Sequence, residues 1–224
     1  MKISFKMACV AVAAAAVVYA GAVPISVSGS LGGQSVNAGG TLTAGAGFVT
    51  VVLNNLQADP TSIIQCVSGL SFDVTGATGS GALSTVNLGE SINIAPGGVY
   101  TVNNLADPLT RWAASETGTH VVALTTLSGG SPSLLIVGPP NGSNLYGHAN
   151  PSITGDNPSV LETATFTVTI PGVTATSTFA NATFFFGTSG EPVGGNVPDG
   201  GTTMALLGLA LLGVETLRRK FAAA

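Results

Sequence analysis

The central part of the chain alternates short apolar runs with clusters of turn-forming residues. Its clearest run covers residues 161–170, where Phe166, Val168 and Ile170 alternate with three threonines. A period of two places one set of side chains on one face of a strand and the other set on the opposite face. This run therefore predicts a β-strand with an apolar inner face and a threonine-rich outer face.

Similar runs recur between clusters of Gly, Pro, Asn and Asp, and none has the period of a long amphipathic helix. We expect the first strand at residues 25–28 and mostly turn at residues 29–40. The other expected strands are residues 48–53, 62–67, 70–74, 83–88, 91–94, 99–102, 120–127, 134–137 and 183–186. About ten short strands at such spacing predict an all-β body, a β-sandwich with a jelly-roll-like order.

The first 22 residues have the pattern of a secretory signal peptide. Lys2 and Lys6 precede an apolar run at residues 7–18, and Ala20 and Ala22 provide an Ala-x-Ala site. This order predicts export, with signal cleavage after Ala22. The alternative is an N-terminal segment that stays in the membrane as an anchor.

A second apolar run, residues 202–217, precedes a basic cluster. At about 1.5 Å per residue this run gives a helix of roughly 24 Å, against a hydrocarbon core of about 30 Å. Arg218, Arg219 and Lys220 follow the run and are expected to stay on the cytoplasmic side. The pattern predicts a short transmembrane helix with a basic anchor, and a buried core helix is the alternative.

A short polar motif stands directly before this apolar run. It reads Val197-Pro198-Asp199-Gly200-Gly201. A polar motif, an apolar helix and a basic cluster in this order resemble the PEP-CTERM class of bacterial sorting signals. The motif is most similar to the variant Val-Pro-Asp-Ser-Gly, called VPDSG-CTERM. Gly200 replaces the serine of that variant, and Glu215 inside the apolar run is a second departure.

The resemblance implies recognition by an exosortase, a membrane protease or transpeptidase that cuts near the motif. It also implies a cell of the Gram-negative type and a link to exopolysaccharide. The physical logic is that of a hydrophobic tail that holds a substrate in the membrane and is then removed. The resemblance is confined to the tail, so it implies nothing about the chemistry of the body.

These patterns divide the chain into four parts. We expect a signal peptide at residues 1–22, a β-sandwich body at 23–187, a flexible linker at 188–196 and the sorting signal at 197–224. The linker is expected because residues 188–196 are rich in glycine and have no clear strand period.

Charge excludes some functions of the body. Charged residues form 7% of the chain, against about 25% in a typical soluble protein. Within residues 23–196, Arg111 is the single basic residue, and eight acids against it leave a net charge near −7. The acids are Asp59, Asp73, Glu90, Asp107, Glu116, Asp156, Glu162 and Glu191. Such a body lacks the basic footprint that nucleic-acid binding requires.

Residues that carry catalytic or metal chemistry are scarce in the body. His120 and His148 are its two histidines and Cys66 is its single cysteine, which does not favour a Ser-His-Asp triad or a zinc site. We expect no catalytic residues, no cofactor and no metal. A loop calcium site near Asp156 and Asn157 stays open as an alternative, because calcium takes oxygen ligands.

Together the patterns favour an exported, non-catalytic cell-surface or extracellular-matrix protein, sorted by an exosortase and associated with exopolysaccharide or biofilm. Its expected partners are the exosortase, the membrane through the C-terminal helix, and exopolysaccharide. We expect it to cross the inner membrane and to reach the envelope, the outer surface or the medium. One alternative is a carbohydrate-binding module with a shallow site on the sandwich. Trp112 with Tyr146 could form a platform for sugar stacking, but a core position is favoured for Trp112. A further alternative is a secreted hydrolase with a pair of carboxylates.

Overall fold

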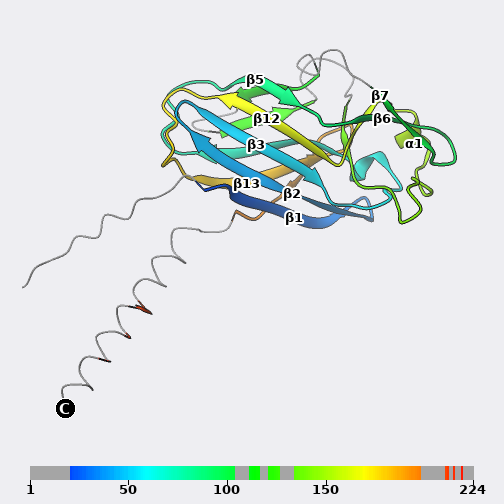
Figure 1. Ribbon diagram of the computed structural model, residues 1–224, viewed down its shortest axis with the longest axis horizontal. Coiled ribbons are helices and arrows are strands. Elements are labelled where there is room, and N and C mark those ends of the chain that lie inside the picture. Colours follow the sequence, from blue (N-terminus) through cyan, green and yellow to red (C-terminus); the bar gives the residue numbers. More distant parts are fainter. Residues whose placement is uncertain are drawn as a thin grey trace, which may run out of the picture.

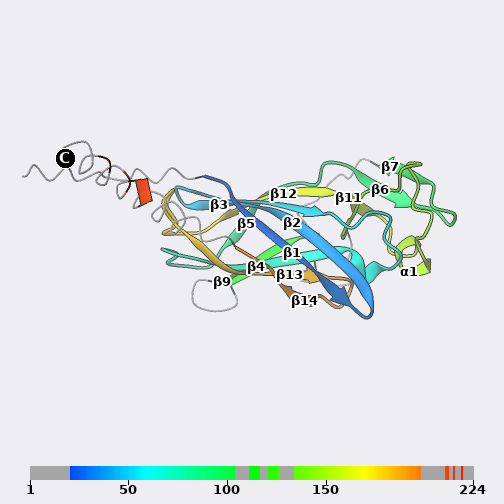
Figure 2. The same ribbon diagram turned by 90° about the horizontal axis from the view of Figure 1, so that it is seen from below.

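The computed structural model describes residues 21–103, 111–116, 121–126 and 134–197, together with residues 210, 211, 214 and 218. Within these residues the chain forms two β-sheets that pack face to face (Figures 1 and 2). The predicted β-sandwich is therefore confirmed.

The first sheet has five antiparallel strands in the order β1-β2-β3-β12-β5. Their bounds are β1 (Val23–Leu31), β2 (Gln34–Gly45), β3 (Phe48–Asn55), β12 (Thr163–Thr169) and β5 (Ala82–Asn87). Three of them, β1 to β3, follow one another along the chain as a meander. A meander does not establish the jelly-roll-like strand order that the sequence predicts, so that order stays a prediction.

The second sheet has nine strands, with the main path β14-β13-β4-β10-β11-β6-β7. Two further strands extend from β4, because β9 pairs with β4 and β8 pairs with β9. The bounds are β4 (Val67–Val74), β6 (Ser91–Ile94), β7 (Tyr100–Asn103), β8 (Ala113–Glu116), β9 (Val121–Thr125), β10 (Ile136–Val137), β11 (Ser159–Leu161), β13 (Phe179–Phe186) and β14 (Glu191–Gly194). Two short helices lie in the connections, η1 (Ile63–Gln65) and α1 (Pro151–Thr154).

Two apolar clusters hold the sandwich together, on opposite faces of the second sheet. The main core lies between the sheets and includes Phe72, Ile136 and Phe166. A smaller cluster includes Val137 and Tyr146. Because Ile136 and Val137 are consecutive in β10, they point to opposite faces, so the middle of the second sheet is buried on both sides.

The long β1–β2 hairpin corrects the prediction of mostly turn at residues 29–40. The turn is confined to Gly32 and Gly33, which both have positive φ, as a two-residue hairpin loop requires. Gly40 is needed because a Cβ there would lie 1.9 Å from the carbonyl oxygen of Val52. Gly, Ala, Ser and Asn are weak strand formers, so tertiary pairing overrides their local preference.

Three further segments differ from the prediction. Residues 62–67, expected as a strand, begin with the 3-10 helix η1. The expected strand 161–170 is divided at Glu162, which has a φ of 58° and separates β11 from β12. The expected linker 188–196 contains β14, which pairs with β13. In this pairing Gly194 is opposite Thr183, and Glu191 is opposite Phe186.

Candidate functional site

The chain leaves the body through a short segment that joins the two sheets. After β14, the N–H of Gly195 donates to the carbonyl of Ala182 at 2.7 Å. The N–H of Asn196 then donates to the carbonyl of Ser26 in β1 at 2.7 Å, and the N–H of Ser26 donates back to the carbonyl of Asn196 at 3.2 Å. Residue 196 is therefore fixed to the first strand, and the two ends of the body meet at one border.

The predicted sorting motif begins at this border. Val197 is half-buried and packs against the main core, so its side chain belongs partly to the body. Pro198, Asp199, Gly200 and Gly201 lie outside the described residues. No sequence pattern predicted the link between Ser26 and Asn196, because glycine-rich residues before a sorting motif have the composition of a linker.

The predicted transmembrane helix and basic anchor lie mostly outside the described residues. Ala210, Leu211, Val214 and Arg218 are described, and all four are helical and exposed. The other two anchor residues, Arg219 and Lys220, are not described. Across the described part of the chain, no helix has the length and apolar character needed to cross a membrane.

The predicted signal cleavage site has one described residue. Ala22 is exposed and directly precedes β1, whereas Ala20 lies outside the described residues. A cut after Ala22 would leave the whole of β1 in the mature protein, because β1 begins at Val23.

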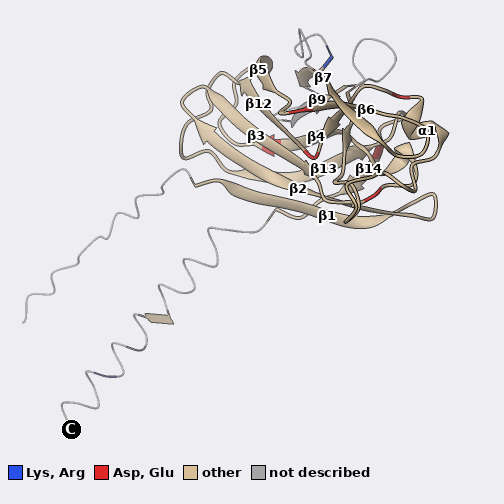
Figure 3. Ribbon diagram, turned by 45° about the vertical axis from the view of Figure 1, so that its right-hand side comes forward, with Lys and Arg blue, Asp and Glu red and all other residues tan. Residues whose placement is uncertain are grey.

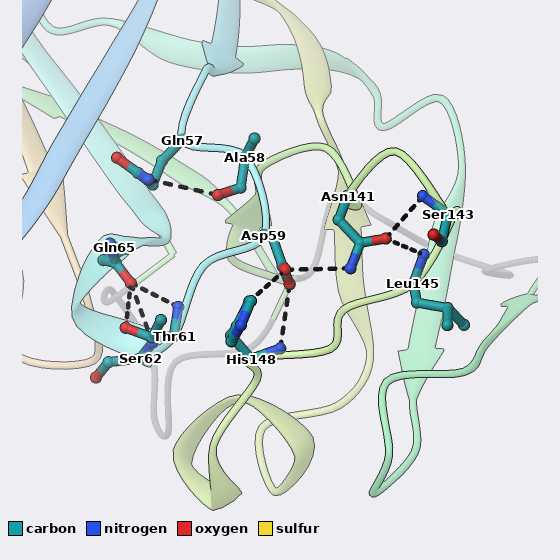
Figure 4. A network of polar contacts seen from close by, with 10 residues as sticks. All are labelled: Gln57, Ala58, Asp59, Thr61, Ser62, Gln65, Asn141, Ser143, Leu145 and His148. Atoms are coloured by element: carbon teal, nitrogen blue, oxygen red, sulfur yellow. Dashed lines mark hydrogen bonds and ion pairs between the residues drawn. The ribbon is translucent and has the colours of Figure 1, made fainter.

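A polar cluster joins two loops at the end of the sandwich where α1 lies (Figures 1 and 4). Asp59 accepts hydrogen bonds from His148 Nδ1 at 2.6 Å and from Asn141 Nδ2 at 3.2 Å on one carboxylate oxygen. Its other oxygen accepts from the backbone N–H of His148 at 3.3 Å. Burial acts to raise the pKa of Asp59, but the hydrogen bonds from His148 and Asn141 outweigh burial and leave the pKa below its ordinary value.

This cluster has a structural use. Asp59 adopts a positive φ of 44°, and its side chain is 11% exposed, while the His148 side chain is 73% exposed. The histidine therefore covers a nearly buried carboxylate and connects the loop after β3 to the loop after β10. No pattern in the sequence indicates the link between His148 and Asp59. His120 lies outside the described residues.

Of the two candidate calcium residues, Asn157 is used by the fold. Asn157 Oδ1 accepts from the N–H of Ile94 at 2.9 Å, and its Nδ2 donates to the carbonyls of Ile94 and Thr154 at 2.8 Å. Burial raises the pKa of Asp156, which disfavours the charged form that a cation would need. In the described ranges, no group of three or more His, Cys, Asp or Glu is placed to hold a metal ion.

The single body cysteine is buried. Cys66 lies in the smaller apolar cluster, where burial raises the pKa of its thiol. A thiol held in its neutral form is a poor nucleophile and a poor metal ligand.

Trp112 and Tyr146 are both core residues, which confirms the favoured core position of Trp112 and excludes the alternative sugar platform. Trp112 is 2% exposed and lies against Phe166, with ring centroids 4.6 Å apart. Tyr146 is fully buried, and its hydroxyl donates to the carbonyl of Gly138 at 2.8 Å. Neither ring can stack on a sugar at the surface.

Comparison with known proteins places a signal at the tail and leaves the body without a match. No curated protein and no solved structure matches the chain. The sequence model of the VPDSG-CTERM motif matches residues 196–221. These residues contain the motif, the apolar run and the basic cluster, in the order on which the resemblance was based. Residues 196–221 are therefore a VPDSG-CTERM motif, a PEP-CTERM-like sorting signal.

Proposed function

We propose that this chain is an exported, non-catalytic protein of the cell surface or extracellular matrix, which an exosortase processes at its C-terminal signal and which associates with exopolysaccharide. The observation that carries the proposal is the VPDSG-CTERM motif at residues 196–221. A signal of this type directs a protein to the envelope through a membrane-bound processing enzyme. The body then acts wherever sorting leaves it.

The geometry of the border supports processing without damage to the body. Among the residues that the structure describes, the last hydrogen bonds between the tail and the sandwich are made by Asn196, one residue before the motif. A cut within the motif would therefore leave β14 and its link to β1 in the released protein. A cut after Ala22 would likewise spare β1.

The membrane part of the proposal rests on residues 202–217. In this proposal the apolar run holds the substrate in the membrane until cleavage, while Arg218, Arg219 and Lys220 stay on the cytoplasmic side. A span of roughly 24 Å is short for a bilayer, which suits a tail that is removed and does not serve as a lasting anchor.

We propose a non-catalytic body because the described side chains that could take part in catalysis have structural roles or are buried. Asp59 and His148 hold two loops together, Asn157 holds β6, and Cys66 is a buried thiol. His148, Asn157 and Cys66 are thus candidates from the sequence that the fold uses in other ways.

Intact-mass analysis of the protein from its own cells tests the proposal. Processing predicts a mature chain that begins at Val23 and ends within residues 197–201. A chain that still ends at Ala224 would contradict exosortase processing.

Two variants make this test specific. Replacing Pro198 and Asp199 together by alanine should leave the tail on the protein, because both residues belong to the recognised motif. Gly200→Ser is the matched control, since it restores the Val-Pro-Asp-Ser-Gly sequence and should be processed at least as completely as the natural chain. Equal processing of the double variant would assign the cleavage to another protease.

A further inference from the structure

The outer face of the first sheet is a regular, uncharged array of hydroxyl groups. In β12 the inward positions are apolar, so the threonines point outward. Thr167 is opposite Thr50 of β3 and Thr85 of β5, and Thr50 is opposite Thr43 of β2. Four threonines from four neighbouring strands thus form one row across the sheet, and Figure 1 shows these strands side by side.

The two neighbouring rows differ from each other. On one side Thr169 is flanked by Ala82 and by the exposed Phe48, so that row is mostly apolar. The row on the other side is more polar. Thr165 is flanked by Asn87 and Val52, and Val52 is followed by Thr41. Rows repeat at about 6.8 Å along a strand and about 4.8 Å between strands. The face therefore offers closely spaced donors and acceptors, with a few apolar atoms between them.

No charged residue belongs to this sheet. The five strands contain no Asp, Glu, Lys, Arg or His, although the body carries eight acids elsewhere (Figure 3). A further row, from Thr163 through Asn54 and Gly39, ends at Ser26 in β1. There it reaches a hollow of about 490 Å³, lined by Ser26, Val27, Ser28, Asn37, Gly194, Gly195 and Asn196. The hollow is uncharged too, so array and hollow share one chemistry.

We propose that this face and the hollow at its β1 border bind a neutral polysaccharide chain. Hydroxyl and amide groups both donate and accept hydrogen bonds, which matches a ligand made of sugar hydroxyls. Binding a neutral chain here removes no charge from water, whereas an anionic polymer would find no cation on this face. The inference rests on the proposed association with exopolysaccharide and gives it a location and a ligand class.

The size of the face argues against a second copy as its occupant. The five strands contain 42 residues, and at about 3.4 Å along and about 4.8 Å across the strand for each residue the face covers roughly 690 Å². A stable protein–protein interface buries about 800 Å² on each partner. A flexible polymer that crosses the face needs no such area, since it gains affinity from many repeated contacts along one chain.

Binding of dextran, a neutral glucan, to the purified full chain in a detergent without sugar groups tests the inference. Carboxymethyl-dextran is the matched probe, because it has the same backbone with added carboxylates. We expect binding to dextran, and weaker binding to carboxymethyl-dextran. No retardation by dextran in affinity electrophoresis, or a preference for the acidic polymer, would overturn the proposal.

Variants locate the site. Replacing Thr50, Thr165 and Thr167 together by valine removes three hydroxyls with little change in shape or strand preference, and should weaken dextran binding at least tenfold. The triple serine variant keeps the hydroxyls and should bind nearly as the natural chain does. Thr183→Val, on the second sheet, is the control for Thr167→Val, and should leave binding unchanged. If the triple valine variant does not fold, the comparison of dextran binding by Thr167→Val and by Thr183→Val tests the site instead.

The outcome is separate from that of sorting. A chain that is processed at the motif but does not bind dextran would refute this inference alone. A chain that keeps its tail but binds dextran through Thr167 would refute the sorting proposal alone. A wild-type dimer in sedimentation that the triple valine variant abolishes would assign the face to self-association and overturn the polysaccharide site.

Discussion

The two sheets of the sandwich bury their strands in different ways. In the first sheet one face meets the core and the other meets solvent, so β3 and β12 alternate strictly between buried and partly exposed positions. In the middle of the second sheet both faces are covered, and β10 is wholly buried. The parallel pair β10–β11 lies in this doubly covered region, where parallel pairing is usually found.

The difference shows which parts of the fold a local pattern can encode. A sheet with one wet face needs alternating residues, and its side-chain period is visible in the sequence. A strand with two buried faces is instead a short continuous apolar run, and the expected strand at residues 134–137 contains β10. Such a run has no alternating period, so it does not indicate which face packs against which part of the chain.

The largest expected effect compares the two faces of β12. Phe166 is fully buried against Trp112, so Phe166→Ala should lower the free energy of unfolding by about 3–5 kcal/mol. Thr167→Val on the outer face should change it by less than about 0.5 kcal/mol. Urea unfolding of both variants measures the difference. Similar losses would mean that the outer face is packed against something.

A smaller effect concerns the connection between the sheets. The buried side chain of Asn55 in β3 donates to the carbonyls of Gln65 and Ile136, each at 2.8 Å. Asn55→Ala removes both buried hydrogen bonds and should cost about 1–3 kcal/mol in urea unfolding. Its neighbour Asn54 is half-buried on the outer face, so Asn54→Ala should cost less than about 1 kcal/mol. Equal costs would show that Asn55 does not brace the second sheet.

The closing contact between β1 and the chain end should contribute less. Asn196→Pro removes the N–H that donates to Ser26, and we expect a loss of about 1 kcal/mol. Asn196→Ala keeps this N–H and should be nearly neutral. Hydrogen exchange at Ser26 gives a second measurement, because its N–H donates to Asn196 and should exchange faster in the proline variant alone. Unchanged exchange would refute the role of this contact.

The smallest effect depends on pH and concerns the loops at the end of the sandwich where α1 lies. The folded-state pKa of Asp59 is lowered from an ordinary value near 3.8, so its stabilising contribution is present above about pH 4. This contribution is lost as the pH falls through the folded-state pKa. His148 is exposed, so the contribution should be below about 1 kcal/mol. Between pH 6 and pH 3, the free energy of unfolding in urea should therefore decrease less for His148→Ala than for the natural chain. Asp59→Asn has no carboxylate to protonate at this position, so the part of the decrease that comes from Asp59 should be absent.

Much of the first sheet was predictable from residues alone. The alternation of Phe166 and Val168 with threonines gave the correct two faces of β12, and the run at residues 48–53 lies within β3. The β1–β2 hairpin was not predictable in the same way. Its buried positions include Val36, Ala38 and Leu42, but the glycines between them have the composition of a turn.

The candidate sites differ in the same way, because some depend on contiguous residues and others on residues far apart in the chain. The sorting signal was predictable because its recognition depends on contiguous residues, and the motif match at residues 196–221 confirms it. The contact of Asp59 with His148 joins residues 89 positions apart, and no local pattern encodes such a pair. A core position was favoured for Trp112, and its burial against Phe166 confirms that position and excludes the sugar platform.

The sequence by itself determined the β-rich body, the two faces of its clearest strand and the sorting signal. These features depend on short-range periodicity or on contiguous motifs, which act before any distant part of the chain is in place. Only the tertiary structure decided that β14 belongs to the body, that Asn196 is fixed to Ser26, and that threonines from four strands form one row. Each of these depends on strand partners that are far apart in the chain, and packing of the whole core selects those partners.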